Sequence, residues 1–196
     1  MAGISSFSAA HFLFLFLFVF FSSAVVSEDD SFVTTVEVED KRVLGLKNEK
    51  LTHFRVYWHD VLGGKNPTAV QIVAPAPASN ASTSSFGLVR MIDNPLTAGP
   101  DPRSKLWGKA QGLYAAASQE NLSFLMAMNF AFMSGKYGGS SITILGRNPV
   151  GEKVREMPVI GGSGAFRFAR GYARVRTLVI NPVAAVVEYN VYVLHY

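Results

Sequence analysis

The sequence predicts an all-β protein whose antiparallel strands close into a barrel or fold into a sandwich. Eight or nine short segments with alternating apolar residues follow one another at nearly regular spacing after residue 50. Turn-forming residues bound each segment, and none of them has the length and period of an amphipathic helix. Closure of the sheet would also remove the free edges at which such apolar strands aggregate.

The amino-terminal part of the chain has a different character. The apolar run FLFLFLFVFF at 12–21 is too short to span a bilayer comfortably, and the small residues of SSAVVS after it suit a signal peptidase. We expect residues 1–27 to be a secretory signal peptide, with a membrane anchor as the alternative because no Lys or Arg precedes the run. Residues 28–50 are charged and lack a sustained period, which indicates a loosely docked arm. Residues 51–196 then form one domain of a secreted, extracellular protein that has no membrane segment in its mature form.

Composition excludes several classes of chemistry. The chain has no cysteine, which rules out disulfides, thiolate metal sites and cysteine catalysis. Its net charge of +4 is mild and its basic residues are scattered, so we expect no nucleic-acid partner. No phosphate loop, HExxH or GxSxG motif occurs, and the histidines after the signal lack metal-site spacing, so no metal or other cofactor is expected. The sequons NAS at Asn80 and NLS at Asn121 predict glycosylated surface positions.

The first strand places a carboxyl group on an apolar face. In LTHFRVYWHD, Phe54, Val56, Trp58 and Asp60 share one face. If this face points inward, Asp60 is a candidate pocket acid and Trp58 a candidate binding residue, since burial would raise the pKa of the carboxyl. The alternative is that Asp60 caps the turn DVLGGKNP that follows. The further strands are expected at about 69–75, 85–93, 105–117, 123–133, 140–147, 153–160, 165–177 and 185–196.

The segments between the strands have turn chemistry. We expect a flexible loop at 74–85, a rigid proline-rich loop at 93–104 and a hairpin turn at 134–140. In the strand 105–117, one face carries small residues and a single aromatic, Tyr114. These small residues either leave space for a ligand inside a barrel or mark bulges and corners. In the strand 123–133, the even-numbered positions are all large and apolar, so this face is core, a lumen wall or a subunit interface. Its residues are Phe124, Met126, Met128, Phe130 and Phe132.

Four arginines occur in the stretch GGSGAFRFARGYARVRT at 161–177. Arg170 shares its parity with Phe166, Phe168 and Tyr172, so this face is a candidate for the pocket, with Arg170 able to hold a phenolate or carbonyl oxygen. A bulge at Gly171 would instead turn Arg170 outward. Arg174 and Arg176 are assigned to solvent or an interface, and Arg167 receives no assignment.

Collinear motifs across 51–196 resemble those of the plant dirigent proteins. They are HDVLGGKNPT, DNPLTAGP, WGKAQGLY, NFAFMSGKYGGSSITILGRN, REMPVIGGSGAFRFARGYA and VEYNVYVLHY. The resemblance implies an eight-stranded antiparallel barrel with a central ligand pocket, a homotrimer with one pocket per subunit, and secretion to the cell wall. It also places the arginine of ARGYA, Arg170, on a pocket-lining strand.

The resemblance implies a function as well. Dirigent proteins orient phenoxy radicals, made by a separate laccase or peroxidase, and so control stereochemistry in phenylpropanoid coupling without oxidising the substrate and without a cofactor. One alternative is the related pterocarpan synthase branch, which removes water from isoflavanols through a quinone methide and closes a ring. A binding or defence barrel that sequesters a phenolic or sugar ligand is the other.

One position departs from the pattern of lignan-forming relatives. After GGSG those proteins have an aspartate that is counted among the pocket carboxylates, whereas this chain has Ala165. The resemblance therefore predicts that Asp60 lacks its usual acidic partner. The segments FRFARGYA and VEYNVYVLHY are closer to the branch that contains the pterocarpan synthases.

Overall fold

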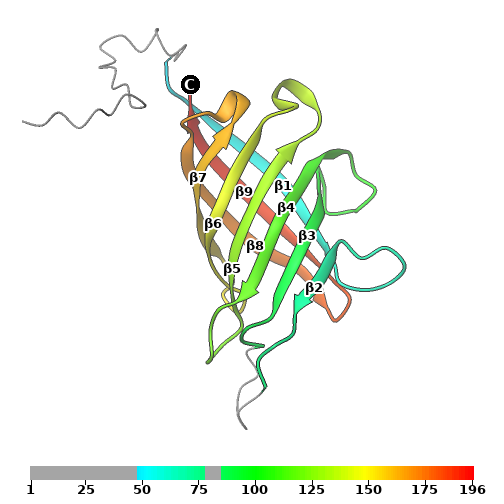
Figure 1. Cartoon of the computed structure of the whole chain (residues 1–196). Helices are drawn as coiled ribbons and strands as arrows, with labels where there is room; N and C mark the ends of the chain where they lie inside the picture. Colours follow the sequence, from blue (N-terminus) through cyan, green and yellow to red (C-terminus); the bar gives the residue numbers. More distant parts are fainter. Residues whose placement is uncertain (1–47, 78–84) are drawn as a thin grey trace, which may run out of the picture. The chain divides into compact units, whose positions relative to one another are not determined.

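The computed structural model describes residues 48–77 and 85–196 (Figure 1). The predicted signal peptide, the arm up to residue 47 and the Asn80 sequon lie outside these residues. Within them no helix is long and apolar enough to cross a membrane. The strands are β1 (Lys50–Val61), β2 (Ala69–Val73), β3 (Val89–Thr97), β4 (Leu106–Ala116), β5 (Ser123–Phe132), β6 (Ser141–Pro149), β7 (Arg155–Ser163), β8 (Arg170–Asn181) and β9 (Ala184–His195). Two short 3₁₀ helices are η2 (Gly135–Tyr137) and η3 (Gly164–Phe166).

Eight strands form a closed antiparallel barrel in the order β1-β9-β8-β7-β6-β5-β4-β3 (Figure 1). The ring closes where β1 pairs with β3, at Tyr57 opposite Thr97 and Trp58 opposite Leu96. The ninth strand, β2, pairs with the other half of β3, Ala69 lying opposite Ile92. The predicted all-β class and the eight-stranded barrel are confirmed, and the sandwich alternative is wrong.

Two predicted boundaries are wrong in ways that affect the site. Strand β3 continues to Thr97, so the first residues of the expected loop 93–104 belong to the sheet. Pro95 is compatible with this because proline holds the preceding residue in an extended conformation. The expected strand 165–177 instead begins with η3 and a turn in which Phe168 has φ 62°, and β8 starts only at Arg170.

Inward-facing side chains alternate along the strands and fill most of the barrel. On β5 the even positions Met126, Met128, Phe130 and Phe132 are buried in the core. The core interpretation of that face is therefore correct. The subunit-interface alternative does not hold for this face, because the barrel itself covers it.

The glycines of β4 mark a close approach of two backbones. A Cβ atom on Gly108 would lie 2.1 Å from the carbonyl oxygen of Ala131, and one on Gly112 would lie 2.2 Å from that of Ala127. Gly112 also has φ +149°, which disfavours other residues. Of the two interpretations left open for this face, a bulge fits Gly108, because the register between β3 and β4 shifts beside it, and neither glycine lines the end pocket described below.

Aromatic rings fill one end of the barrel interior. Phe166 is fully buried, and its ring packs against those of Phe54, Phe132, Tyr137 and His195 at centroid distances of 4.9 to 5.7 Å. We call these five residues the aromatic plug. His195 also hydrogen-bonds through Nε2 to the hydroxyl of Thr52, so the polar atoms at this end have partners.

Candidate functional site

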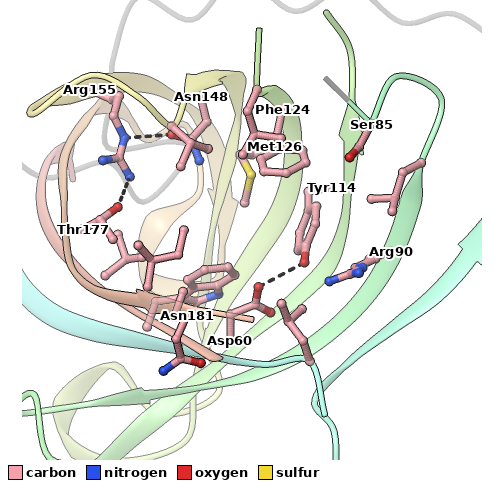
Figure 2. A pocket seen from close by; sticks show the side chains of 18 of the residues that line it. Asp60, Ser85, Arg90, Tyr114, Phe124, Met126, Asn148, Arg155, Thr177 and Asn181 are labelled. Carbon is pink, nitrogen blue, oxygen red and sulfur yellow. Dashed lines mark hydrogen bonds between the residues drawn. The ribbon is translucent and has the colours of Figure 1, made fainter. Parts of the chain in front are cut away.

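The other end of the barrel contains a cavity of about 210 Å³, which we call the end pocket (Figure 2). Its lining comes from the last residues of β1, β4, β6 and β8, the first residues of β3, β5, β7 and β9, and the loops at that end. The apolar walls of the pocket are formed by Trp58, Leu88, Phe124, Met126 and Val187. On each strand, every second side chain points into the barrel. These inward side chains form the core along most of the strand and line the pocket at its end.

Asp60 lies in this pocket with only 5% of its surface exposed. One carboxylate oxygen accepts a hydrogen bond from the Asn94 amide at 2.9 Å. The other accepts one from the Tyr114 hydroxyl at 3.0 Å, which Figure 2 marks with a dashed line. The following turn is instead held by Thr68, whose backbone N–H and hydroxyl both bond to Val61. Asp60 therefore lies in the pocket, bonded to Asn94 and Tyr114, and does not cap the turn.

Register explains how Asp60 meets Asn94. The antiparallel pairs that close the barrel are Tyr57 with Thr97 and Trp58 with Leu96. Continuing that register by two residues brings Asn94 opposite Asp60, with both side chains on the inner face because facing alternates along each strand. The contact is therefore a consequence of barrel closure.

Burial raises the pKa of the Asp60 carboxyl above its ordinary value. Hydrogen bonds from Asn94 and Tyr114 and the positive charge of Arg90 act in the opposite direction without cancelling the effect of burial. Burial and the nearby Asp60 charge also raise the pKa of the Tyr114 phenol, so Tyr114 stays a neutral donor at ordinary pH. The site therefore combines a carboxyl that binds its proton more tightly than an exposed one with a neutral hydroxyl donor.

A second polar group lies across the pocket from Asp60 (Figure 2). The guanidinium of Arg155 is buried and donates to Asn148 Oδ1 and to Thr177 Oγ1, both at 2.9 Å, and to the Glu152 carbonyl at 3.3 Å. Burial lowers its pKa from the very high ordinary value of a guanidinium, and it remains a cation. In the described part of the chain no carboxylate lies within ion-pair distance of it, so it is available to an oxygen of a bound molecule.

Three buried polar side-chain atoms of the described residues have no hydrogen-bond partner: Trp58 Nε1, Arg90 Nε and Asn94 Oδ1. Trp58 and Arg90 line the pocket, and Asn94 bonds to Asp60. Buried polar atoms are normally paired, so their concentration here sets this end of the barrel apart from the plug. Such atoms are common where a protein has been shaped for function instead of stability.

The structure separates the predicted site residues into two groups. It brings Asp60, Tyr114 and Trp58 together in the end pocket. It places Arg170, Phe168 and Tyr172 outside it, which corrects their assignment to a pocket-lining face. On β8 the inward residues are Ala173 and Val175, so the even positions point outward.

The physical reason is the interruption by η3. Parity does not carry from Phe166, which is buried, through a 3₁₀ turn to Arg170. Phe168 is 56% exposed, Tyr172 stacks on Tyr192 at the surface, and Arg170 forms an ion pair with Glu49 at 2.6 Å. No register shift occurs at Gly171, so the bulge considered there is absent, although Arg170 does face outward.

Two further predictions concern Ala165 and Asn121. Ala165 lies in η3, where its N–H bonds to Ser140 and its carbonyl oxygen contacts His195, so it belongs to the plug end. An acidic group at this position would not reach the pocket, and the predicted loss of a partner for Asp60 does not follow. Asn121 is exposed in the loop between β4 and β5, as expected for a sugar acceptor.

Sequence reasoning missed Arg90, Asn94, Asn148 and Arg155. Arg155 shares its parity with the buried residues Met157 and Val159, so a charged residue on an apolar face was visible in REMPV. Asn94 was hidden because DNPLTAGP was interpreted wholly as a loop. Arg90 carries the same signal, because it lies between the buried residues Leu88 and Ile92, and Asn148 continues the parity of the buried Ile142 and Ile144.

The arrangement suits a flat, partly polar molecule. Aromatic and aliphatic walls can pack against rings, while Asp60 with Tyr114 and Arg155 with Asn148 can bond oxygens on two sides. Among residues 48–77 and 85–196 no three His, Cys, Asp or Glu side chains gather in a way that could hold a metal ion. The chemistry available from these groups is proton donation, hydrogen bonding and orientation.

Comparison with known proteins identifies relatives. The model of the family described as Dirigent-like protein matches residues 51–194. Dirigent protein 7 of Arabidopsis thaliana is 57% identical over 178 residues, covering 89% of this chain and 92% of its own. Pterocarpan synthase 1 of Glycyrrhiza echinata is 46% identical over 157 residues, covering 79% and 83%. Among solved structures, the pterocarpan synthase dirigent protein GePTS1 is similar with a TM-score of 0.71 at 45% identity, over 76% of this chain and 87% of that one.

Proposed function

Because the chain belongs to the family of dirigent-like proteins, we propose that its end pocket holds a phenolic substrate in one orientation and fixes the stereochemistry of the bond that forms there. The observation that carries this is the pairing of apolar walls with oxygen-binding groups on two sides of one cavity. In the main form of the proposal the substrates are phenoxy radicals of phenylpropanoids. A separate laccase or peroxidase supplies them, and the pocket determines which faces couple.

The physical basis is proximity and exclusion of water. Holding reactive partners in one geometry raises their effective concentration and removes competing approaches. Trp58 and Phe124 would pack against the aromatic ring, while Tyr114 and Arg155 would bond its oxygens. Neither role requires the protein to exchange electrons with the substrate.

A second candidate is the ring closure performed by pterocarpan synthases. The buried Asp60 favours it, because a carboxyl with a raised pKa can protonate a leaving hydroxyl. In that reaction the C–O bond of an isoflavanol hydroxyl breaks as Asp60 donates its proton and water leaves, while the phenol hydroxyl conjugated with that carbon releases its own proton to solvent, which gives a neutral quinone methide. The 2'-hydroxyl then attacks the quinone methide and its proton returns to the Asp60 carboxylate, while the former phenol oxygen takes up a proton from solvent again. The similarity to two pterocarpan synthases of solved structure supports this alternative.

One experiment separates the candidates. The protein is incubated with coniferyl alcohol and a one-electron oxidant, and separately with a 2'-hydroxyisoflavanol, and the products are resolved by chiral chromatography. Optically active dimers support stereoselective coupling, and ring closure supports the dehydratase. Racemic dimers with unreacted isoflavanol contradict both and leave a barrel that only binds phenolic or sugar ligands.

We also propose that the protein is a homotrimer whose barrels meet through an apolar outer face. Cross-strand register aligns a row of apolar residues across β2 to β6, Val70, Met91, Leu113, Ala127 and Leu145. Val70, Met91 and Leu145 are exposed and the other two are partly exposed, and an apolar row of this length is typical of a subunit interface. Met91→Arg would dissociate the trimer in light scattering, whereas Ile160→Arg, an exposed apolar position on β7, would leave it intact. A wild-type monomer at micromolar concentration would contradict the proposal.

Export through the secretory route, with sugar on Asn80 and Asn121, belongs to the same proposal. The exposed position of Asn121 supports it. Material made in a plant or insect host would lose mass on enzymatic deglycosylation. An unchanged mass would count against export or against the accessibility of these positions.

A further inference from the structure

Asn94 occupies an unusual position beside the carboxyl group of the end pocket. It is completely buried, and its amide nitrogen donates to Asp60 Oδ1 at 2.9 Å. Its own oxygen, Oδ1, is buried without a partner. An unpaired buried acceptor costs stability, so a residue that retains one calls for an explanation.

The explanation lies in what a neutral Asp60 needs. With Tyr114 donating to Asp60 Oδ2, a proton on the carboxyl resides on Oδ1, which faces Asn94. A neutral acid must donate that proton to an acceptor, and the amide nitrogen of Asn94 cannot accept it. The unpartnered oxygen of the same amide can, after a half-turn about χ2 that leaves the shape of the side chain almost unchanged.

We propose that Asn94 is a positioning residue for Asp60, whose amide donates to the ionised carboxylate and, turned by a half rotation, accepts the proton of the neutral acid. This inference rests on the proposed acid role of Asp60. A carboxyl group that cycles between acid and base is then hydrogen-bonded in both states, although it is enclosed by the barrel. Each proton transfer to or from the substrate is accompanied by a turn of one amide.

The other groups around Asp60 cannot take this role. Arg90 on β3 is a donor only, and Tyr114 on β4 already points its hydroxyl hydrogen at Asp60 Oδ2. Tyr189 on β9 is fully buried and stays neutral because burial raises its pKa. Asn94 is therefore the neighbour that offers both a donor and an acceptor to the same carboxyl oxygen.

The test measures the pKa of Asp60 by carboxyl ¹³C NMR in the full chain, without substrate. Asn94→Leu keeps the size of the side chain and removes both the donor to the ionised form and the acceptor for the neutral form. Because a hydrogen bond to a charged group is roughly twice as strong as one between neutral groups, the pKa of Asp60 should still rise, by about one pH unit. Thr97→Val is the matched control, because Thr97 is buried on the same strand but bonds to His59. It should leave the pKa of Asp60 unchanged.

A second measurement needs no variant. In the wild-type protein, the side-chain NH₂ signals of Asn94 should shift with pH at the same midpoint as the Asp60 carboxyl, because the amide turns when the carboxyl gains its proton. Amide signals that do not respond across that titration overturn the proposal, and so does an unchanged pKa in a folded Asn94→Leu protein. Because neither measurement involves turnover, a wrong substrate assignment for the pocket would not affect them.

Discussion

The two ends of the barrel interior use the same strands for opposite purposes. At the plug end, rings from β1, β5, η2, η3 and β9 pack against one another as part of the core. At the pocket end, the inward positions of the same sheet carry Asp60, Asn94, Asn148 and Arg155, and a cavity is left. Stability is therefore concentrated at one end, which allows the other to retain buried polar groups that weaken a core.

The largest expected effect comes from removing the acid of the pocket. Asp60→Asn keeps the shape of the side chain and removes the proton. If the chain performs ring closure, the rate should fall about 10²–10⁴-fold, the usual contribution of general acid catalysis, with little change in melting temperature. Rates on a 2'-hydroxyisoflavanol and thermal unfolding curves check this.

The same variant distinguishes the two proposed reactions. Radical orientation would suffer less, because a neutral amide can still bond a phenol oxygen, so yield should hold while enantiomeric excess falls. Full activity and full stereoselectivity of Asp60→Asn would show that the site assignment is wrong, while the family assignment would stand.

The next effect belongs to the plug. Phe166→Ala removes a fully buried ring from the centre of five packed aromatic residues and should lower the free energy of unfolding by about 3–5 kcal/mol. Denaturant titration measures the loss. At temperatures where the variant is folded, its stereoselectivity should equal that of the wild type. A selective loss of activity in a folded Phe166→Ala protein would mean that the two ends are not independent.

Much of this contrast could be predicted from the sequence, and the reason is periodicity. The alternation of Phe54, Val56, Trp58 and Asp60 correctly placed a carboxyl inside, and the single aromatic on the bare face of β4, Tyr114, was correctly expected in the pocket. Alternation is a local property, so it is reliable wherever a strand is continuous.

The rest could not be predicted because it depends on interruptions and on closure. Counting parity from Phe166 to Arg170 failed because η3 breaks the strand. Ala165 was connected with the pocket by the resemblance alone, and the structure places it in η3 at the plug end. The partnership of Asp60 with Asn94 exists only because β1 and β3 close the ring, a pairing between segments 34 residues apart. No local pattern carries that information.

A smaller effect concerns the dependence of stability on pH. The pKa of Asp60 is raised in the folded state by burial, so the folded protein holds its proton when the unfolded chain has already released it. The contribution of Asp60 to stability is therefore complete below its unfolded value near 3.8 and is lost as pH rises through the folded value. The stability of Asp60→Asn relative to the wild type should rise over that interval. Denaturant titrations at several pH values check the sign, and a difference that falls with pH would contradict the raised pKa.

The smallest expected effect tests the outer face of β8. Arg170 points away from both ends of the interior, and its guanidinium is paired with Glu49 at the surface. Arg170→Lys keeps the charge and replaces the planar guanidinium with an ammonium group. This change would strongly reduce activity if Arg170 bound a phenolate, but it should have little effect on an exposed ion pair. We expect stereoselectivity and rate to stay within about twofold and stability within about 0.5 kcal/mol of the wild type.

The measurements are the same chiral chromatography and unfolding titrations that are applied to Asp60→Asn. Because the two variants differ only in which side of the sheet they alter, a tenfold loss of activity in Arg170→Lys would show that the exterior of β8 takes part in the chemistry, and the separation between a working interior end and an inert exterior would have to be abandoned.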